Sequence, residues 1–148
     1  MGLTYQPPLA GLGSRFLAAL IDGLIVIALM IPGGAISYGG MMVNPKDPSI
    51  AAAVFGSLLS MVLAFGYLAV VLVMWTKGQT PGKRILGLRV IKLDTGQPAT
   101  FWRMALRDII GKWVSGAICF LGYIWALLDA NKQGWHDKIA GTIVVKES

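Results

Sequence analysis

Residues Ile50 to Trp75 read IAAAVFGSLLSMVLAFGYLAVVLVMW, an apolar run of 26 residues with no charged side chain. Phe16 to Ser37, which reads FLAALIDGLIVIALMIPGGAIS, is a second run of 22 residues with one charge. A hydrocarbon core about 30 Å thick needs roughly 20 helical residues to cross it. The sequence therefore predicts two full transmembrane helices, over residues 16–37 and 50–75.

The composition of the whole chain agrees with this prediction. Its 148 residues favour a single domain over 1–148. Only 14% of the residues are charged, where soluble domains carry about 25%, and the mean hydropathy is +0.67. Such apolar content excludes intrinsic disorder, and a single cysteine, Cys119, excludes a disulfide framework and a multi-cysteine zinc site. We expect no metal site and no cofactor.

A third apolar run, Trp113 to Leu128, is shorter than the first two. It has 16 residues and is interrupted by Gly116 and Gly122. It either crosses the membrane once or enters and returns as a helical hairpin, because a backbone break is tolerated in a membrane where other protein shields it. The short length and the charge distribution favour the re-entrant hairpin.

The basic residues indicate the topology. The chain has thirteen Lys and Arg against seven Asp and Glu, and eight of the thirteen lie in residues 76–112. The positive-inside rule places this basic segment, and with it the N-terminus, in the cytoplasm of a multi-pass inner-membrane protein. The excess charge then needs no nucleic-acid partner. The residues expected to face anionic lipid headgroups are Lys83, Arg84, Arg89, Arg103 and Lys112.

Two short aliphatic stretches predict a small cytoplasmic β element in a fold that is otherwise an all-α membrane protein. Ile85 to Leu93 precedes a turn at residues 94–96, and Thr142 to Val145 supplies a partner on the same side of the membrane. Between them, Phe101 to Lys112 has the pattern of an interfacial amphipathic helix or a helix entering the bilayer, with Thr100 as N-cap.

Asp22 is the residue most in need of explanation. An ionised carboxylate facing lipid inside a transmembrane helix costs on the order of 2.5 to 3.5 kcal/mol. Arg15 is two helical turns away, about 10 Å along the axis, so we expect a partner on another helix: Arg103, Arg107 or Lys112. Asp22 is either a structural ion-pair member or a site that binds a proton or cation. Because a cleaved signal peptide rarely carries such a carboxylate, we expect the first helix to be retained.

Small residues recur at four-residue spacing on the second helix, at Ala52, Gly56, Ser60 and Ala64. Such a stripe lets helix backbones approach closely, so it predicts a packing face within one chain or between chains of a homo-oligomer.

No motif predicts an enzyme. Gly78 to Lys83 lacks the glycine spacing of a phosphate-binding loop, and Arg84 stands where Ser or Thr would bind magnesium. His136, the one histidine, lies beside Asp137 with no nucleophile in a recognisable motif. We interpret it as part of a hydrogen-bonded turn, and expect no catalytic residue.

Taken in order, these features resemble the RDD family of small bacterial membrane proteins over roughly Leu12 to Val145. That family has an Arg at the start of its first transmembrane helix and an Asp within it, like Arg15 and Asp22. The stretch GQTPGKRILGLRV at 78–90 and the later Arg107 also match, as does the ending around Asp129 and WHDKIAGT at 135–142. The family's second Asp corresponds to Asp137, with Asp129 as the rival.

The resemblance implies a polytopic membrane protein, and some family members are described as sodium or other monovalent cation/proton antiporters. The first functional hypothesis is therefore transport of a monovalent cation or proton through an Asp/Arg site. Its candidate residues are Arg15, Asp22, Arg107, Asp108, Asp129 and Asp137. The alternative is a non-catalytic membrane adaptor whose basic face binds anionic lipid or a partner protein.

Overall fold

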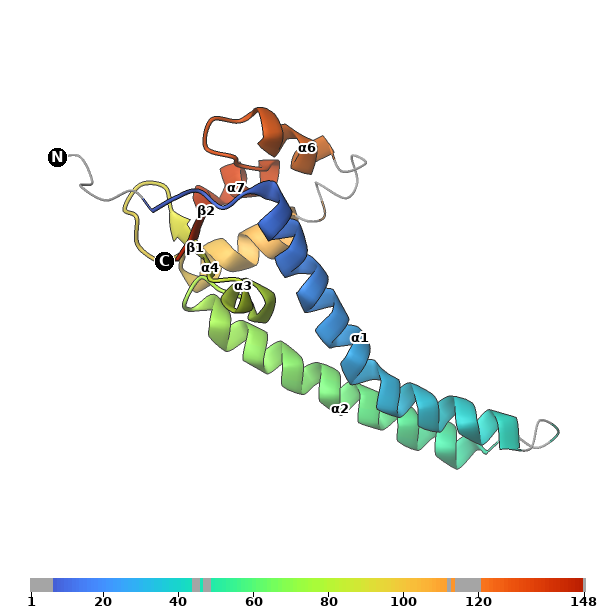
Figure 1. The fold of residues 1–148 in the computed structure, drawn as a ribbon. Helices are drawn as coiled ribbons and strands as arrows, with labels where there is room; N and C mark the ends of the chain where they lie inside the picture. The colour runs from blue at the N-terminus through green and yellow to red at the C-terminus, as the bar shows by residue number, and fades with distance from the viewer. Residues whose placement is uncertain (1–6, 44–45, 47–48, 112, 114–120, 148) are drawn as a thin grey trace. The chain divides into compact units, whose positions relative to one another are not determined.

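A computed structural model describes residues 7–43, 46, 49–111, 113 and 121–147 (Figure 1). Contacts divide the chain into two compact units. We call Met1–Leu20 with Leu72–Ser148 the polar unit, and Ile21–Val71 the helix pair. The described elements are α1 (Leu12–Val43), α2 (Ile50–Trp75), α3 (Pro81–Ile85), β1 (Leu88–Lys92), α4 (Phe101–Ala105), the π-helical η1 (Leu106–Gly111), α6 (Leu121–Leu128), α7 (Trp135–Ala140) and β2 (Thr142–Lys146).

Both predicted transmembrane helices are present, and both are long and apolar enough to cross a membrane. The second has the predicted bounds, whereas α1 extends beyond residues 16–37 at both ends, to Leu12 and Val43. Their large apolar side chains, such as Ile31 and Phe65, are mostly exposed. A soluble protein would bury such side chains against a core, so these surfaces suit lipid as their solvent.

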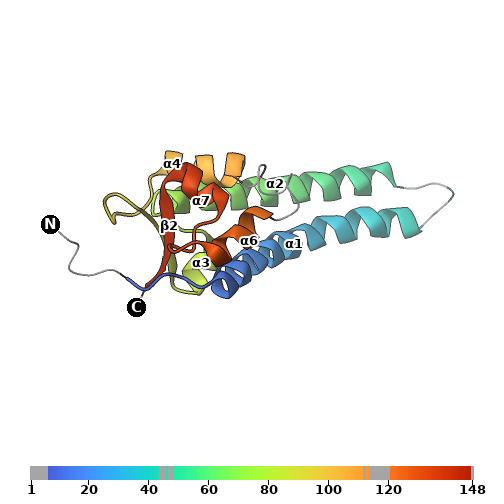
Figure 2. The ribbon, with the colours of Figure 1, turned by 90° about the horizontal axis from the view of Figure 1, so that it is seen from above.

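Small residues join α1 to α2 within the helix pair, where the two helices lie side by side (Figures 1 and 2). A Cβ atom added at Gly56 would overlap Ser37 and the carbonyl oxygen of Gly33, and one at Gly33 would overlap Ser60. The backbones can approach this closely only because these positions lack larger side chains. The stripe therefore packs inside one chain at Gly56 and Ser60.

The other two residues of the stripe, Ala52 and Ala64, have different surroundings. Ala52 lies against Gly40 of α1, because a Cβ atom at Gly40 would overlap the Ala52 methyl group. Ala64 is exposed. Three of the four residues thus contact α1, and a homo-oligomer would need a different contact face.

The predicted β element is a two-stranded antiparallel sheet in the polar unit. β1 pairs with β2 so that Val90 lies opposite Val144, and both are fully buried. Isolated bridges cover both outer edges, Leu9 beside Val145 and Pro98 beside Ile91. Covered edges prevent a short sheet from pairing with other chains. The start predicted at Ile85 was too early, because residues 81–85 form α3.

The turn before α3 explains the glycine at Gly78. Its φ of 67° is in the left-handed region, and an added Cβ would overlap the carbonyl oxygen of Val90. Thr80 then caps α3, accepting a hydrogen bond from the Lys83 N–H at 3.4 Å, with Pro81 in the first turn.

The helix predicted over residues 101–112 is α4 followed by the π-helical turn η1. Thr100 occupies the N-cap position of α4 but makes no side-chain capping bond there. Within the third apolar run the structure describes Trp113 and α6. The choice between a single span and a re-entrant hairpin depends on residues that lie outside the described chain. Cys119 and Lys112 also lie outside the described residues.

Candidate functional site

The polar unit is organised around a fully buried carboxylate, Asp137. It is the third residue of α7, which begins directly after Gly134. Its Oδ2 accepts a hydrogen bond from the Gly134 N–H at 3.2 Å, so it satisfies a backbone donor at the start of its own helix. The motif WHDKIA thus forms a helical turn, in agreement with the interpretation from sequence.

Two arginines from distant parts of the chain meet at this carboxylate. Arg15 at the start of α1 places Nη1 2.9 Å from Oδ2, and Arg107 on η1 places Nε 2.6 Å from Oδ1. Arg15 also donates from Nη2 to the carbonyl oxygen of Val144 on β2, at 3.4 Å. We call Arg15, Arg107 and Asp137 the Asp137 cluster. It connects α1 with η1, α7 and β2, which lie far from α1 in the sequence.

The charges of the cluster keep Asp137 ionised. Burial alone would raise the pKa of Asp137, but the charges of Arg107 and Arg15 and the hydrogen bond from the Gly134 N–H hold that pKa below its usual value. A carboxylate with a low pKa and three donors on its oxygens is poorly suited to pick up and release a proton near neutral pH.

His136, the neighbour of Asp137, is neutral at physiological pH. Burial, only partly opposed by the charge of Asp137, lowers the pKa of His136 to about 4. The charge of Asp108 is close enough to raise the pKa of His136, against the effect of burial. Of the acidic candidates named from sequence, Asp108 and Asp137 are therefore neighbours of His136 in the polar unit.

Asp22 lies in the other unit, the helix pair. The hydroxyl of Tyr67 on α2 donates a hydrogen bond to Asp22 Oδ1 at 3.4 Å. Two of the three cations expected near Asp22 have contacts elsewhere: Arg107 with Asp137, and Arg103 with Asp94 at 3.2 Å. Sequence reasoning missed Tyr67, although a tyrosine within an apolar helix was a visible signal for a polar contact.

Asp129 organises a turn. Its Oδ1 is 2.6 Å from Lys138 Nζ, and its Oδ2 accepts from the backbone N–H groups of Asn131 and Gln133. The hydrogen bond from Lys138 is the main reason that the pKa of Asp129 is lowered. Asp129 therefore joins α6 to α7, whereas Asp137, which was identified with the family's second Asp, lies between the two arginines.

The five basic residues expected to face lipid have different surroundings. Lys83 is buried, Arg103 pairs with Asp94 and also donates to the Gly141 carbonyl oxygen, and Arg84 is exposed. Arg89 pairs with Glu147 at 2.8 Å. Much of the basic segment therefore serves internal contacts.

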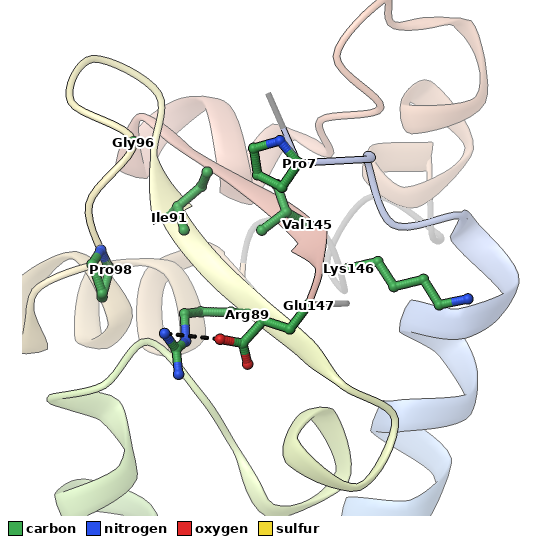
Figure 3. Close-up of a pocket in the computed structure, with 8 residues that line it drawn as sticks. All are labelled: Pro7, Arg89, Ile91, Gly96, Pro98, Val145, Lys146 and Glu147. Atoms are coloured by element: carbon green, nitrogen blue, oxygen red, sulfur yellow. Dashed lines mark ion pairs between the residues drawn. The ribbon is translucent and has the colours of Figure 1, made fainter. Parts of the chain in front are cut away.

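The Arg89–Glu147 pair borders a shallow surface pocket of about 260 Å³ beside the sheet (Figure 3). Glu147 also accepts a hydrogen bond from Gln79 at 2.9 Å, and the Lys146 side chain extends away from the pair (Figure 3). The pocket thus presents polar groups that already contact one another. It is lined by Pro7, Arg89, Ile91, Gly96, Pro98, Val145, Lys146 and Glu147.

Comparison with known proteins identifies the family. The family model described as "RDD family" matches residues 9–141, a range that contains all three members of the Asp137 cluster and Asp22. The chain belongs to the RDD family. This confirms the resemblance inferred from the sequence, and with the two apolar helices it marks the chain as an RDD-type membrane protein.

Relatives of this RDD protein occur in several bacteria. An uncharacterized protein of Haemophilus influenzae is 31% identical over 90% of this chain and 75% of its own length. The membrane protein YteJ of Bacillus subtilis is 30% identical over 93% and 81%. A proline-rich antigen homolog of Mycobacterium tuberculosis is 32% identical over 89% of this chain, which spans 61% of that relative's length. No solved structure matches the chain.

Proposed function

We propose that this RDD protein exchanges a monovalent cation for a proton at Asp22, with Tyr67 as its hydrogen-bonding partner. The observation that carries the proposal is the contact of the Tyr67 hydroxyl with Asp22, made between two helices long enough to cross a membrane. In this proposal the protein is a multi-pass protein of the inner membrane, with its N-terminus and residues 76–112 in the cytoplasm. The concentration of basic residues in that segment supports this orientation.

The electrostatics of the helix pair favour Asp22 as the exchanging group. It is the one acidic residue in the sequence of α1, and α2 has none. A carboxylate in an apolar span is stabilised either by taking up a proton or by binding a cation, so the two ligands compete for the same oxygens. Tyr67 can donate to the ionised carboxylate and orient it in either state.

The Asp137 cluster has a different role in this proposal. Its carboxylate is already neutralised by two guanidinium groups, and its low pKa leaves it ionised at neutral pH. We assign it the task of holding the start of α1 against the C-terminal elements. Because two or three spans hardly enclose a pathway, the transporting form in this proposal is a homo-oligomer.

The test is proton movement in everted membrane vesicles when sodium, lithium or potassium is added. We expect Asp22→Asn to abolish cation-dependent proton flux, and Tyr67→Phe to weaken it while leaving some activity. Asp94→Asn is the matched control, because it removes one carboxylate outside both apolar helices. The proposal would be wrong if Asp22→Asn, present at wild-type abundance in the membrane, retained full flux.

A membrane adaptor is the second candidate function, and one observation favours it. The Asp137 cluster and the sheet make a folded polar unit on the chain, and Arg84 is exposed on its surface. In this alternative Asp22 serves stability alone. Asp22→Asn would then lower the melting temperature or the abundance of the protein, with no cation-dependent flux in the wild type to lose.

A further inference from the structure

The segment formed by α4 and η1 has two contrasting faces. Met104 is fully buried, and Arg107 pairs with Asp137. In contrast, Trp102 is 78% exposed and Ile109 is 57% exposed. Leu106 is also exposed, as is Trp113, which lies beyond the end of η1, so exposed large apolar side chains recur at spacings of three or four residues. We call Trp102, Leu106, Ile109 and Trp113 the tryptophan stripe.

The structure fixes where this segment begins relative to an apolar helix. Phe101, the first residue of α4, contacts Trp75, the last residue of α2, with ring centroids 5.8 Å apart. Tryptophans at the ends of spanning helices sit at the level of the lipid headgroups. If α2 spans the bilayer, the contact with Trp75 therefore brings the start of α4 to the headgroup end of that helix.

Exposed cations near the same helix end fit a headgroup environment. Lys77 follows Trp75 by two residues and is exposed, and on α3 the neighbouring Arg84 and Ile85 are both exposed. Exposed tryptophan and, on neighbouring elements, exposed basic residues both suit the headgroup level, where tryptophan is enriched and basic side chains meet anionic lipid.

We propose that α4 and η1 form an interfacial helix, whose tryptophan stripe inserts into the headgroup layer of the bilayer that α1 and α2 span. Arg107, on the opposite face, ties this helix to Asp137, so the stripe anchors the polar unit to the lipid surface. The proposal does not depend on cation exchange, because it concerns residues outside the helix pair.

The test measures membrane depth with nitroxide labels on the full chain in phospholipid nanodiscs. Labels are attached at Trp102→Cys and, separately, Ile109→Cys, each combined with Cys119→Ser. Gln97→Cys is the matched control, because Gln97 is exposed in the same unit and lies outside the stripe. We expect collisions with lipid-soluble oxygen to exceed those with a water-soluble nickel chelate at 102 and 109, and the reverse at 97.

Two results would overturn the proposal. Nickel accessibility at 102 and 109 equal to that at 97 would mean that the stripe faces water. Spin–spin broadening at 102 that disappears on dilution with unlabelled chain would mean that a second copy covers the stripe. A second measurement avoids cysteine: in liposomes with brominated lipid, Trp102→Phe with Trp113→Phe should reduce the quenched share of tryptophan emission. An unchanged share would also contradict insertion.

Discussion

Two carboxylates of this RDD protein have different surroundings. Asp137 in the polar unit is fully buried and contacts two guanidinium groups and a backbone N–H. Asp22 in the helix pair receives a hydrogen bond from the neutral hydroxyl of Tyr67. A buried carboxylate paired with cations stays ionised and holds structure together, whereas for Asp22 we propose the exchange of a proton and a cation.

The largest expected effect tests whether Asp137 is structural. Asp137→Asn keeps the shape of the side chain but removes the charge that the two arginines share. Breaking a buried ion pair from one side typically costs about 3 to 5 kcal/mol, so we expect the free energy of unfolding of the polar unit to fall by that amount. The measurement is urea unfolding in mild detergent, followed by tryptophan emission, because all five tryptophans lie in the polar unit.

Asp94→Asn is the control for this prediction. Asp94 pairs with Arg103, but its side chain is 58% exposed, and exposed pairs contribute at most about 1 kcal/mol. If the two variants were equally stable, the Asp137 cluster would not be what holds the polar unit together.

The next effect concerns the helix pair, which is held by close packing of small residues. Gly56→Val would push a side chain into Ser37 and the backbone of Gly33. Overpacking a tight contact typically costs about 1 to 3 kcal/mol. We therefore expect the helices to separate at a lower SDS fraction, and tryptophan emission from the polar unit to change less than in Asp137→Asn.

Separation of the helices is measured by energy transfer between two dyes, attached to cysteines that replace Leu24 on α1 and Phe65 on α2. Both positions are exposed and can therefore carry a dye. Gly66→Val is the control on the same helix, since a Cβ atom at Gly66 meets nothing within 4 Å. Equal SDS midpoints for the two valine variants would contradict the role of the small residues.

The sequence was sufficient for features that depend on local pattern. The apolar run 50–75 has the bounds of α2 because its length and lack of charge are direct requirements of a span. The aliphatic stretches that became β1 and β2 were visible for a similar reason, since each required a partner. The small-residue stripe also identified a real packing face, at Ala52, Gly56 and Ser60.

Pairing between side chains depends on tertiary structure, and there the sequence was less informative. Arg15 and Asp137 are 122 positions apart, and no periodicity links them. For Asp22 the cost of its charge pointed to a cation, Arg103, Arg107 or Lys112, and gave no indication of the hydrogen bond from Tyr67. Charge counts also could not reveal that Arg89 and Arg103 serve internal contacts.

The smallest expected effect is a difference in how the stability of the two units depends on pH. His136 has a pKa of about 4 in the folded chain, against about 6.5 when unfolded, so the unfolded state takes up a proton first as pH falls. Its contribution to stability is complete above pH 6.5 and is lost progressively between pH 6.5 and 4. At pH 5 the polar unit should be less stable than at pH 7 by about 2 kcal/mol.

His136→Gln should remove most of this loss, because His136 is the sole histidine in the sequence. The lowered pKa of Asp137 affects stability in a lower pH range. Its contribution to the free energy of unfolding is present above the ordinary carboxyl pKa of about 4 and is lost only below that pH. Urea unfolding at pH 7 and pH 5, read by tryptophan emission, compares the variant with wild type.

The SDS midpoint of the helix pair should not move between these pH values through histidine titration, because no histidine lies in Ile21–Val71. If His136→Gln still lost stability between pH 7 and pH 5, the acid sensitivity of the polar unit would come from carboxylates and not from His136. The contrast between the two units would then depend only on the arginine pairs of Asp137.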